Sequence, residues 1–273
     1  MSSTAETTHA EPAAPDGDVL LRSDNGKVRT LTLNRPERSN AMNGELSARL
    51  AAEIAAAEAD LDVWVVVLTG AGNSFCGGVD LKEMASVDAG RARPLRSRVT
   101  STRSVFEMMM QMQTPVIGAL NGHAVAAGFE LALACDIRIA AAGARLGVPE
   151  AKRGMGAAFA SVMLPRMIPP GIALELLFTG RYISAEDALG LGLVNQVVPA
   201  GEVAGAAAEL SAAIAANAPL TIRRMKANVH GTSGMPLPTA LHLGLGPDPY
   251  ASEDRVEGVR AFVEKRAPEW RNR

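Results

Sequence analysis

The sequence predicts a mixed α/β protein whose last part is helical. Short apolar runs typical of buried strands alternate with helical segments as far as about residue 198. From about Ala204 onward the pattern is helical throughout. We therefore expect a core over residues 19–198 and a helical domain over 199–273. A tail over 1–18, rich in Ala, Thr, Pro and acidic residues, is expected to be disordered.

The strands are predicted from apolar runs that end at turn residues. They lie near Val28–Leu33, Val63–Thr69, Val116–Leu120 and Ile137–Ala140. The second run is β-branched and almost wholly apolar, which suits a strand that is buried on both faces. Residues 70–73 end this run, and Asn121-Gly122 ends the third.

Three helices are predicted between or after these strands. Residues 48–58 are rich in alanine, which favours a helix. Residues 126–135 form an apolar run of helical length that contains one carboxylate, Glu130. Ser184 precedes Ala185 to Leu189 and is a good N-cap, so a third helix is expected to begin there.

Composition indicates one large core and argues against several classes of protein. The 273 residues are 48% hydrophobic, which is enough to bury one core with some extension. A net charge of −2 gives no reason to expect a nucleic acid partner. Cys76 and Cys135 are too few for a disulfide framework and favour a reducing compartment. Without a metal-ligand spacing, a membrane-length apolar stretch or a signal peptide, the chain is expected to bind no metal and to be cytoplasmic.

Two segments of small residues, at 74–80 and 121–130, each follow a predicted strand. Because glycine and alanine leave the backbone N–H groups open to close approach, the two turns are expected to form one oxyanion hole. The second turn opens the helix near Ala126, whose N-terminal end carries unpaired N–H groups and a partial positive charge. An enolate oxygen would be stabilised there.

Two carboxylates are candidates for proton transfer. Glu130 lies inside the apolar helix, and Glu150 follows Pro149 in the next apolar segment. A carboxyl group in apolar surroundings has a raised pKa, which suits a general acid or base near neutral pH. Taken singly, Glu130 is more simply explained as a helix-face carboxylate and Glu150 as a turn or first-turn helix residue.

Other features near the turns favour ordinary explanations. Gly70-x-Gly72 after a strand is typical of dinucleotide-binding turns, but Phe75 stands at the third glycine position. Cys76 has no histidine at a recognisable partner position, so we expect it to pack rather than react. His123 is expected to be structural, although a contact with a ligand stays possible. The Arg-rich stretch 91–103 is either a solvated helix face or a lid over a bound chain.

The order of several motifs resembles the crotonase, or enoyl-CoA hydratase/isomerase, superfamily from about Val19 to the C-terminus. Each motif alone is a weak signal, but their order over more than two hundred residues is specific. The matching segments are Leu33–Pro36, Asn40–Asn43, Phe75–Leu81, Asn121–Leu131, Pro149-Glu150, Thr179–Arg181, Gly190–Val194 and Ala261–Arg266. Segments 128–134, 149–152, 232–236 and 252–266 are most similar to carnitinyl-CoA dehydratase-like members.

The resemblance implies a spiral of β-β-α turns with a C-terminal helical trimerisation domain. It implies an enoyl-CoA hydratase, which adds water reversibly to a 2-enoyl-CoA thioester. Backbone N–H groups of Val79 and Ala127 would polarise the thioester carbonyl, and Glu130 and Glu150 would hold the water. No cofactor is implied beyond the coenzyme A of the substrate, and the expected assembly is a homotrimer or a dimer of trimers.

The same resemblance assigns the residues that bind the acyl-CoA. Arg and Lys suit phosphate groups, and an aromatic ring can cover adenine. Phe262 and Lys265 match positions that reach a neighbouring subunit's ligand. The full set of expected binding residues is Arg38, Ala41, Gly77, Gly78, Asp80, Leu81, Gly128, Ala158, Phe159, Phe262 and Lys265.

Three departures from the family pattern leave alternatives open. Ala126 and Ala127 stand where typical hydratases have glycines, Val79 replaces a commoner alanine, and Phe159 lies in a turn that is usually glycine-rich. If the added bulk blocks the water site, double-bond isomerisation by one glutamate becomes the better interpretation. A non-catalytic paralogue that retains acyl-CoA binding is the alternative from another class.

Overall fold

The computed structural model describes residues 17–88 and 103–273. The predicted tail therefore lies almost wholly outside the described residues, as does most of the Arg-rich stretch. Arg103, the last arginine of that stretch, is described and is exposed.

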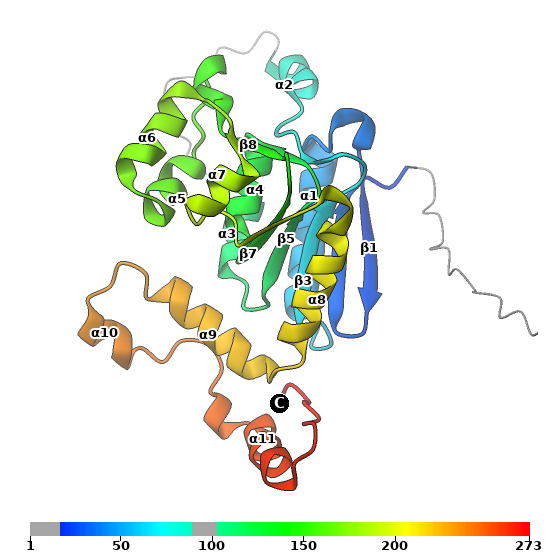
Figure 1. The fold of residues 1–273 in the computed structure, drawn as a ribbon, viewed down its shortest axis with the longest axis vertical. Coiled ribbons are helices and arrows are strands. Elements are labelled where there is room, and N and C mark those ends of the chain that lie inside the picture. The colour runs from blue at the N-terminus through cyan, green and yellow to red at the C-terminus, as the bar shows by residue number, and fades with distance from the viewer. Residues whose placement is uncertain (1–16, 89–102) are drawn as a thin grey trace, which may run out of the picture.

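A six-stranded sheet forms the centre of the fold (Figure 1). Its order is β1-β2-β3-β5-β7-β10, and every neighbouring pair is parallel except the β1–β2 hairpin. Its middle strands are buried on both faces, which explains their unbroken apolar sequences. The strands are β1 (Leu20–Asn25), β2 (Val28–Leu33), β3 (Val65–Gly70), β5 (Val116–Leu120), β7 (Ile137–Ala141) and β10 (Gln196–Val198).

A second sheet of short strands lies after the carboxyl ends of the first. It has the order β4-β6-β8-β9 and consists of β4 (Ser74–Cys76), β6 (His123–Val125), β8 (Arg145–Gly147) and β9 (Ile183–Ser184). Each of β3, β5 and β7 continues into one of these strands and then into a helical segment. These segments are α2 (Leu81–Asp88), α4 (Ala127–Ala134) and the 3-10 helix η2 (Pro149–Arg153). The chain thus repeats a strand-strand-helix unit, and successive units pair in parallel to form a spiral.

Helices cover the spiral core. The longest, α1, buries Leu46, Leu50, Ile54 and Ala57, a spacing that places one apolar stripe against the sheet. Asn43 caps it by accepting a hydrogen bond from the Leu46 N–H at 2.9 Å. The helices of this part of the chain, besides α2, α4 and η2, are η1 (Pro36–Arg38), α1 (Gly44–Ala59), α3 (Val105–Gln111), α5 (Ala160–Met167), α6 (Pro170–Thr179) and α7 (Ala185–Gly190).

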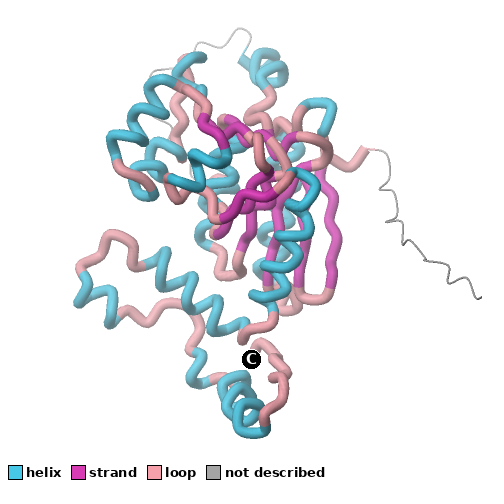
Figure 2. The backbone as a smooth tube through the Cα atoms, viewed as in Figure 1, coloured by secondary structure: helices cyan, strands magenta, loops and turns pink. Residues whose placement is uncertain are grey.

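The chain after β10 is helical, as predicted. Figure 2 shows the strands of the core above a C-terminal region of helices and loops. The predicted boundary near Val198 falls at the end of β10, yet α8 packs against β3, β5 and β7 of the core sheet. The elements are η3 (Ala200–Glu202), α8 (Val203–Ala215), α9 (Pro219–Gly231), α10 (Leu237–His242), η4 (Pro249–Ala251) and α11 (Glu253–Glu264).

Polar contacts attach α9 to the core. The Lys226 ammonium donates to the Asp136 carboxylate at 2.7 Å and to the Thr114 carbonyl at 3.0 Å. His230, one turn later, lies 3.0 Å from the same carboxylate. Asp136 also accepts the Val116 N–H, and its pKa is lowered by these partners despite burial, which acts in the opposite direction.

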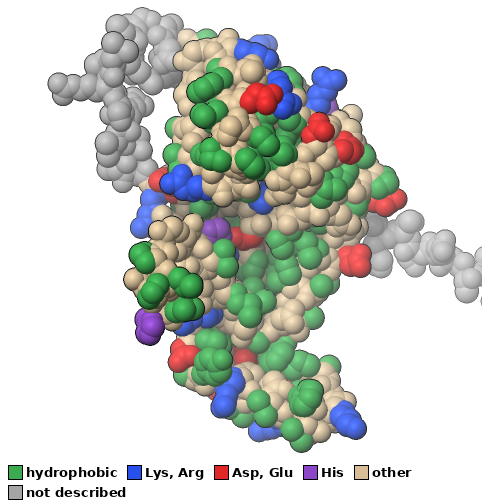
Figure 3. All heavy atoms as spheres, turned by 60° about the vertical axis from the view of Figure 1, so that its left-hand side comes forward, with side chains coloured by type: hydrophobic (Ala, Val, Ile, Leu, Met, Phe, Trp, Pro, Cys, Tyr) green, Lys and Arg blue, Asp and Glu red, His purple; other side chains and the backbone are tan. Residues whose placement is uncertain are grey.

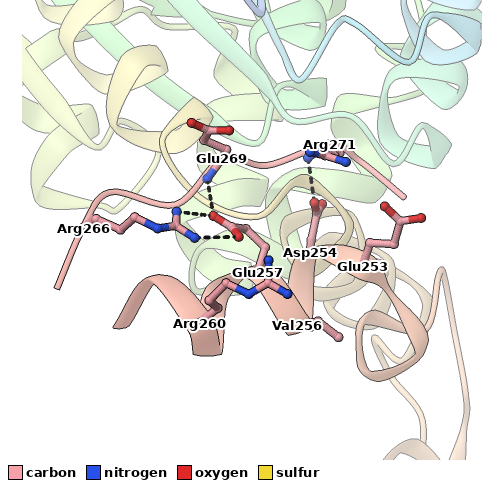
Figure 4. A pocket seen from close by; sticks show the side chains of 8 residues that line it. All are labelled: Glu253, Asp254, Val256, Glu257, Arg260, Arg266, Glu269 and Arg271. Carbon is pink, nitrogen blue, oxygen red and sulfur yellow. Dashed lines mark hydrogen bonds and ion pairs between the residues drawn. The ribbon is translucent and has the colours of Figure 1, made fainter. Parts of the chain in front are cut away.

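The residues after α11 fold back along that helix (Figure 4). The buried Asp254 carboxylate accepts the N–H groups of Arg271 at 2.6 Å and Asn272 at 3.0 Å. The Trp270 indole donates to the Ala216 carbonyl at 2.8 Å. A bidentate ion pair between Arg266 and Glu257 completes the wall of a small cavity at this end of the molecule. The last residues therefore connect α11 with the end of α8.

The structure confirms the predicted strands and helices with small shifts. β2 and β5 have the predicted bounds, β7 is one residue longer, and β3 begins at Val65 rather than Val63. Helix α1 begins four residues before the predicted start because Asn43 provides the cap. Ser184 is the N-cap of α7, as predicted, and forms a capping box with Asp187.

The described residues contain no single helix that is long and apolar enough to cross a membrane. One pair passes the same test of length and composition together, Ala200–Ala215 with Pro219–Gly231, but it bends by 104° at the break.

Candidate active site

The two predicted turns meet in space. A Cβ atom on Gly78 would lie 2.7 Å from the Ala126 Cβ, 2.9 Å from the Val125 carbonyl oxygen and 3.5 Å from the Ala127 nitrogen. Gly78 also has a φ of 99°, a conformation that L side chains rarely adopt. Glycine at this position therefore allows the first turn to lie directly against the start of α4.

Val79 and Ala127 present free backbone N–H groups at this contact. In the described part of the chain, neither N–H has an acceptor. Ala127 is the first residue of α4, where N–H groups have no partner within the helix. Two unpaired donors on adjoining turns are the arrangement expected for an oxyanion hole.

Glu130 is fixed by the start of α5. Its Oε1 accepts the backbone N–H groups of Phe159 at 3.1 Å and Ala160 at 2.8 Å. The side chain is buried, and burial raises the pKa of the Glu130 carboxyl while the two N–H donors partly offset the rise. The second oxygen, Oε2, has no hydrogen-bond partner among the described residues and is available to a ligand.

Glu150 is the second buried carboxylate of the site. It lies in the first turn of η2, after Pro149, and its Oε2 is buried without a partner among the described residues. Burial raises the pKa of the Glu150 carboxyl, and the negative charge of Glu130 adds to the rise. Both carboxyls therefore titrate closer to neutral pH than ordinary glutamates do, which suits proton transfer.

Two cavities adjoin at the paired turns. The smaller, about 210 Å³, holds both glutamates and the edge of the oxyanion turns. Its lining is Gly77, Val79, Leu81, Val125, Ala126, Ala127, Glu130, Glu150, Arg153, Met155, Ala157 and Ala158. The larger, about 940 Å³, shares Val79, Ala127 and Glu130 with the first and extends between α1 and α3. Met42, Ala48, Val105 and Phe106 give this larger cavity an apolar wall.

Of the eleven predicted acyl-CoA residues, four line one of the two cavities. Gly77, Leu81 and Ala158 line the smaller cavity, whereas Arg38 is exposed in η1 and Ala41 follows it. Gly78 and Gly128 are buried between the turns, and a Cβ on Gly128 would lie 2.1 Å from the Cys76 carbonyl oxygen. Asp80 lines the larger cavity, but its carboxylate is bound by Arg35 at 2.9 Å.

Phe262 and Lys265 lie apart from the two cavities within one chain. Phe262 is 85% exposed on α11, and Lys265 is the C-cap of that helix. Figure 1 places α11 at the end of the molecule opposite α2.

A family model described as "Enoyl-CoA hydratase/isomerase" matches residues 23–273. The chain belongs to this family. It is 36% identical to a short-chain-enoyl-CoA hydratase of Clostridium acetobutylicum, over 91% of this chain and 95% of that protein. It is 37% identical to a carnitinyl-CoA dehydratase of Salmonella typhi, over 94% and 99%. A crystal structure of an enoyl-CoA hydratase from Bacillus anthracis superimposes with a TM-score of 0.85 at 35% identity, over 94% of this chain and 100% of that one.

Phe159 was one of the three expected departures from the family pattern, and the structure shows where its ring lies. The Phe159 ring packs against Phe106, with centroids 5.2 Å apart and an angle of 36° between the planes. Phe159 is not among the residues that line the cavity between the glutamates, and its N–H donates to Glu130. Ala157 takes a φ of 41° in the same segment, a conformation that glycine adopts at lower cost.

Two further predictions near the site concern Cys76 and His123. Cys76 is fully buried, and burial raises the pKa of its thiol to about 11, so it packs as an uncharged thiol. His123 accepts the Arg145 N–H at 3.0 Å and thereby joins β6 to β8. The buried thiol confirms the prediction that Cys76 packs, and this hydrogen bond agrees with the structural role predicted for His123.

Sequence reasoning missed several residues that line the site. Arg153 and Met155 lie at the smaller cavity, and Arg35 lies under the first turn. Arg153 follows Glu150 by three residues, a spacing that would have placed it beside that carboxylate in a helical turn. Within the described residues no cluster of three or more His, Cys, Asp or Glu side chains is arranged to hold a metal ion.

Proposed function

We propose that this protein is an enoyl-CoA hydratase, a lyase that adds water reversibly to the double bond of a 2-enoyl-CoA thioester. The observation that supports this function is the placement of two buried carboxylates on one cavity beside two free backbone N–H groups. Both carboxyls have raised pKa values, and each has an oxygen without a hydrogen-bond partner among the described residues. An acid and a base are what water addition requires.

The mechanism follows from these groups. The N–H groups of Val79 and Ala127 would donate to the thioester oxygen, which makes the β-carbon electrophilic and stabilises the enolate that forms. Glu130 and Glu150 would hold a water molecule between them. One glutamate, as the carboxylate, takes a proton from this water while the water oxygen attacks the β-carbon. The other glutamate, as the carboxylic acid, gives a proton to the α-carbon. In reverse, the same pair removes water from a 3-hydroxyacyl-CoA.

Coenzyme A would enter along the first turn. Gly77, Leu81 and Ala158 line the smaller cavity. Arg38 is exposed and precedes Ala41 by three residues. A guanidinium group at this position suits a phosphate of the nucleotide. No cofactor other than the coenzyme A of the substrate is part of this mechanism.

We also propose that the protein assembles as a trimer or a dimer of trimers. The C-terminal helices expose many large apolar side chains, which single soluble chains rarely do. Figure 3 shows them gathered on these helices and along the groove beside the core. They include Met225, Val229, Leu237, Leu241, Tyr250, Phe262 and Val263, each more than half exposed. Phe262 and Lys265 would then contact the coenzyme A of a neighbouring subunit. A cytoplasmic location stays a prediction.

The proposal is tested by a hydration assay that follows loss of the conjugated enoyl thioester. Crotonyl-CoA, longer 2-enoyl-CoAs and crotonobetainyl-CoA are compared as substrates. The chain is about equally similar to the short-chain-enoyl-CoA hydratase and to the carnitinyl-CoA dehydratase described above. Glu130→Gln and Glu150→Gln should each lower kcat by about 10²-fold to 10⁴-fold, with KM changed little. Glu186→Gln removes an exposed carboxylate on α7 and should leave kcat unchanged.

The same experiment separates the alternatives. Water addition that is lost in both Glu130→Gln and Glu150→Gln supports the hydratase. Movement of the double bond without water addition, dependent on one glutamate, would replace it with an isomerase. Tight binding of acyl-CoA without turnover would indicate a binding protein that lacks the reaction.

A further inference from the structure

An ion pair joins Arg35 to Asp80, the last residue of the first oxyanion turn (residues 74–80). The Arg35 Nη2 donates to the Asp80 Oδ2 at 2.9 Å, and both side chains are largely shielded from solvent, at 14% and 13% exposure. The other arm of the guanidinium, Nη1, donates to the Ala41 carbonyl. Asp80 immediately follows Val79, so this pair is one residue away from a proposed oxyanion donor.

A short parallel pairing determines the direction of the Val79 N–H. The Met42 N–H donates to the Gly78 carbonyl at 2.7 Å, and the Asp80 N–H donates to the Met42 carbonyl at 2.9 Å. In such a pairing, the residue between the two bonds directs its own N–H and C=O to the opposite edge. The pairing with Met42 therefore directs the Val79 N–H away from residues 39–42.

Arg35 is itself held firmly. Its backbone N–H donates to the Asn40 Oδ1 at 2.9 Å. The Asn40 amide group is fully buried and donates to the carbonyls of Ala71 at 2.9 Å and Ser74 at 2.7 Å. Arg35 and Asn40 together thus connect three segments: the η1 turn, the residues after β3 that lead into the first oxyanion turn, and Asp80 within that turn.

Asp80 is equally committed to the protein. Its Oδ1 accepts the N–H groups of Lys82 at 3.2 Å and Glu83 at 3.4 Å at the start of α2. The Arg35 guanidinium beside it lowers the pKa of the Asp80 carboxyl, so the pair is ionised at neutral pH. Both carboxylate oxygens have partners inside the protein, which distinguishes Asp80 from Glu130 and Glu150.

We propose that Arg35 and Asp80 are positioning residues that hold the Val79 N–H toward the thioester oxygen. They act through the backbone and do not touch the reacting atoms. This inference rests on the proposed function, because it assigns the Val79 N–H to the oxyanion. Lysine cannot replace Arg35, since one ammonium cannot reach the Ala41 carbonyl and the Asp80 carboxylate with the planar geometry of the guanidinium.

The test compares Asp80→Asn and Arg35→Lys with the unmodified protein. Both variants should lower kcat with crotonyl-CoA by about 10-fold to 10³-fold, the range expected when one oxyanion donor is weakened or lost. KM should stay within about threefold, because the loss falls on the transition state. The double variant should be little worse than either single variant, since the two residues act as one unit.

A second readout does not depend on turnover. Butyryl-CoA cannot be hydrated, and hydrogen bonds to its thioester carbonyl lower the C=O stretching frequency in the infrared. The frequency of bound butyryl-CoA should be higher in Asp80→Asn and Arg35→Lys than in the unmodified protein. Glu150→Gln removes a proton-transfer group and should leave this frequency unchanged.

A matched control breaks an Arg–Asp pair elsewhere. Asp24 accepts two hydrogen bonds from the buried Arg29 in the β1–β2 hairpin, away from both cavities. Asp24→Asn should lower the melting temperature but leave kcat and the carbonyl frequency unchanged. Should Asp80→Asn fail to fold, Arg35→Lys retains the charge and carries the same test.

The outcomes separate this inference from the proposed function. An active protein whose Asp80→Asn and Arg35→Lys variants keep the kcat and carbonyl frequency of the parent would overturn the positioning role alone. An inactive protein that still polarises butyryl-CoA, and loses this polarisation in the two variants, would overturn the hydratase and support the positioning role.

Discussion

Ala126 is a strained residue of the site. Its φ of 55° and ψ of −130° lie in a region that is open to glycine and closed to ordinary L residues. The strained residue precedes Ala127, the second proposed oxyanion donor, and its methyl group faces Gly78. Glycine would adopt this conformation without this cost, so Ala126 stores strain next to the second proposed oxyanion donor.

Ala126→Gly should therefore stabilise the protein. Relief of strain of about 1–3 kcal/mol outweighs the greater freedom of glycine in the unfolded chain, which leaves a gain of about 1 kcal/mol. We expect a rise in melting temperature of about 2–4 °C by calorimetry. Ala55→Gly, in the exposed middle of α1, is the control and should lower stability by about 1 kcal/mol. A loss of stability in both variants would show that Ala126 is not strained.

Glu150 makes the free energy of unfolding decrease as the pH rises above the usual pKa of a glutamate. Its raised pKa means that the folded state disfavours the carboxylate. The penalty is absent below about pH 4.3, where the unfolded chain also carries the neutral acid, and it is complete once the pH exceeds the raised value.

Glu150→Gln should consequently raise the melting temperature, and the gain should increase from pH 4 to pH 8, because glutamine is neutral throughout. Thermal unfolding at several pH values measures this trend. Glu257 is the opposite control, since the Arg266 guanidinium lowers its pKa to about 2. Glu257→Gln should lower stability near pH 7, with a loss that shrinks as the pH falls below about 4. A gain for Glu150→Gln that is the same at all pH values would contradict the burial of its charge.

At the scale of elements, one carboxylate binds two backbone amides of the C-terminal segment. Asp254, at the start of α11, accepts two backbone N–H groups of the final residues while almost wholly buried (Figure 4). Asp254→Ala would leave both donors without an acceptor, at a cost of about 2–4 kcal/mol.

Hydrogen exchange is the measurement for this variant. The amides of Arg271 and Asn272 should exchange much faster in Asp254→Ala, while those of the core strands keep their protection. Glu253→Ala is the neighbouring control, because its ion pair with Arg273 is exposed and is expected to contribute less than about 1 kcal/mol. Unchanged exchange at Arg271 and Asn272 would show that other contacts hold this segment.

The sequence predicted the long elements well and the short ones poorly. Val116–Leu120 has its predicted bounds because the apolar run stops at Asn121-Gly122, where the strand also stops. Strands such as β4 and β6 have three residues each, too few to show any periodicity. They exist because neighbouring units of the spiral pair with them. The residues of β4 and β6 were predicted only as parts of turns.

The candidate site shows the same contrast. Glu130 and Glu150 were predictable because a carboxylate within an apolar segment is conspicuous, and the family resemblance connected them. Arg35 and Asp80 are separated by 45 residues, and neither is unusual in its local sequence. Only the pairing of residues 39–42 with 77–80 in the folded chain brings them together.

On the scale of the whole molecule, the exposed apolar helices predict self-association. Leu241→Glu places a charge on α10, where the parent side chain is 73% exposed, and should shift the mass in solution from three or six chains toward one. Analytical ultracentrifugation gives this mass. Leu61→Glu alters another apolar residue, 65% exposed before β3, and should leave the mass unchanged. A single-chain mass for the unmodified protein would contradict the proposed assembly.

The two proposed oxyanion donors belong to successive units of the spiral, since Val79 precedes α2 and Ala127 begins α4. Neither unit contains the catalytic geometry by itself. During refolding, helices can form from local contacts, whereas the donors converge only when the units dock. Recovery of turnover therefore reports a late folding step. After dilution from denaturant, it should lag behind recovery of the helical circular dichroism signal.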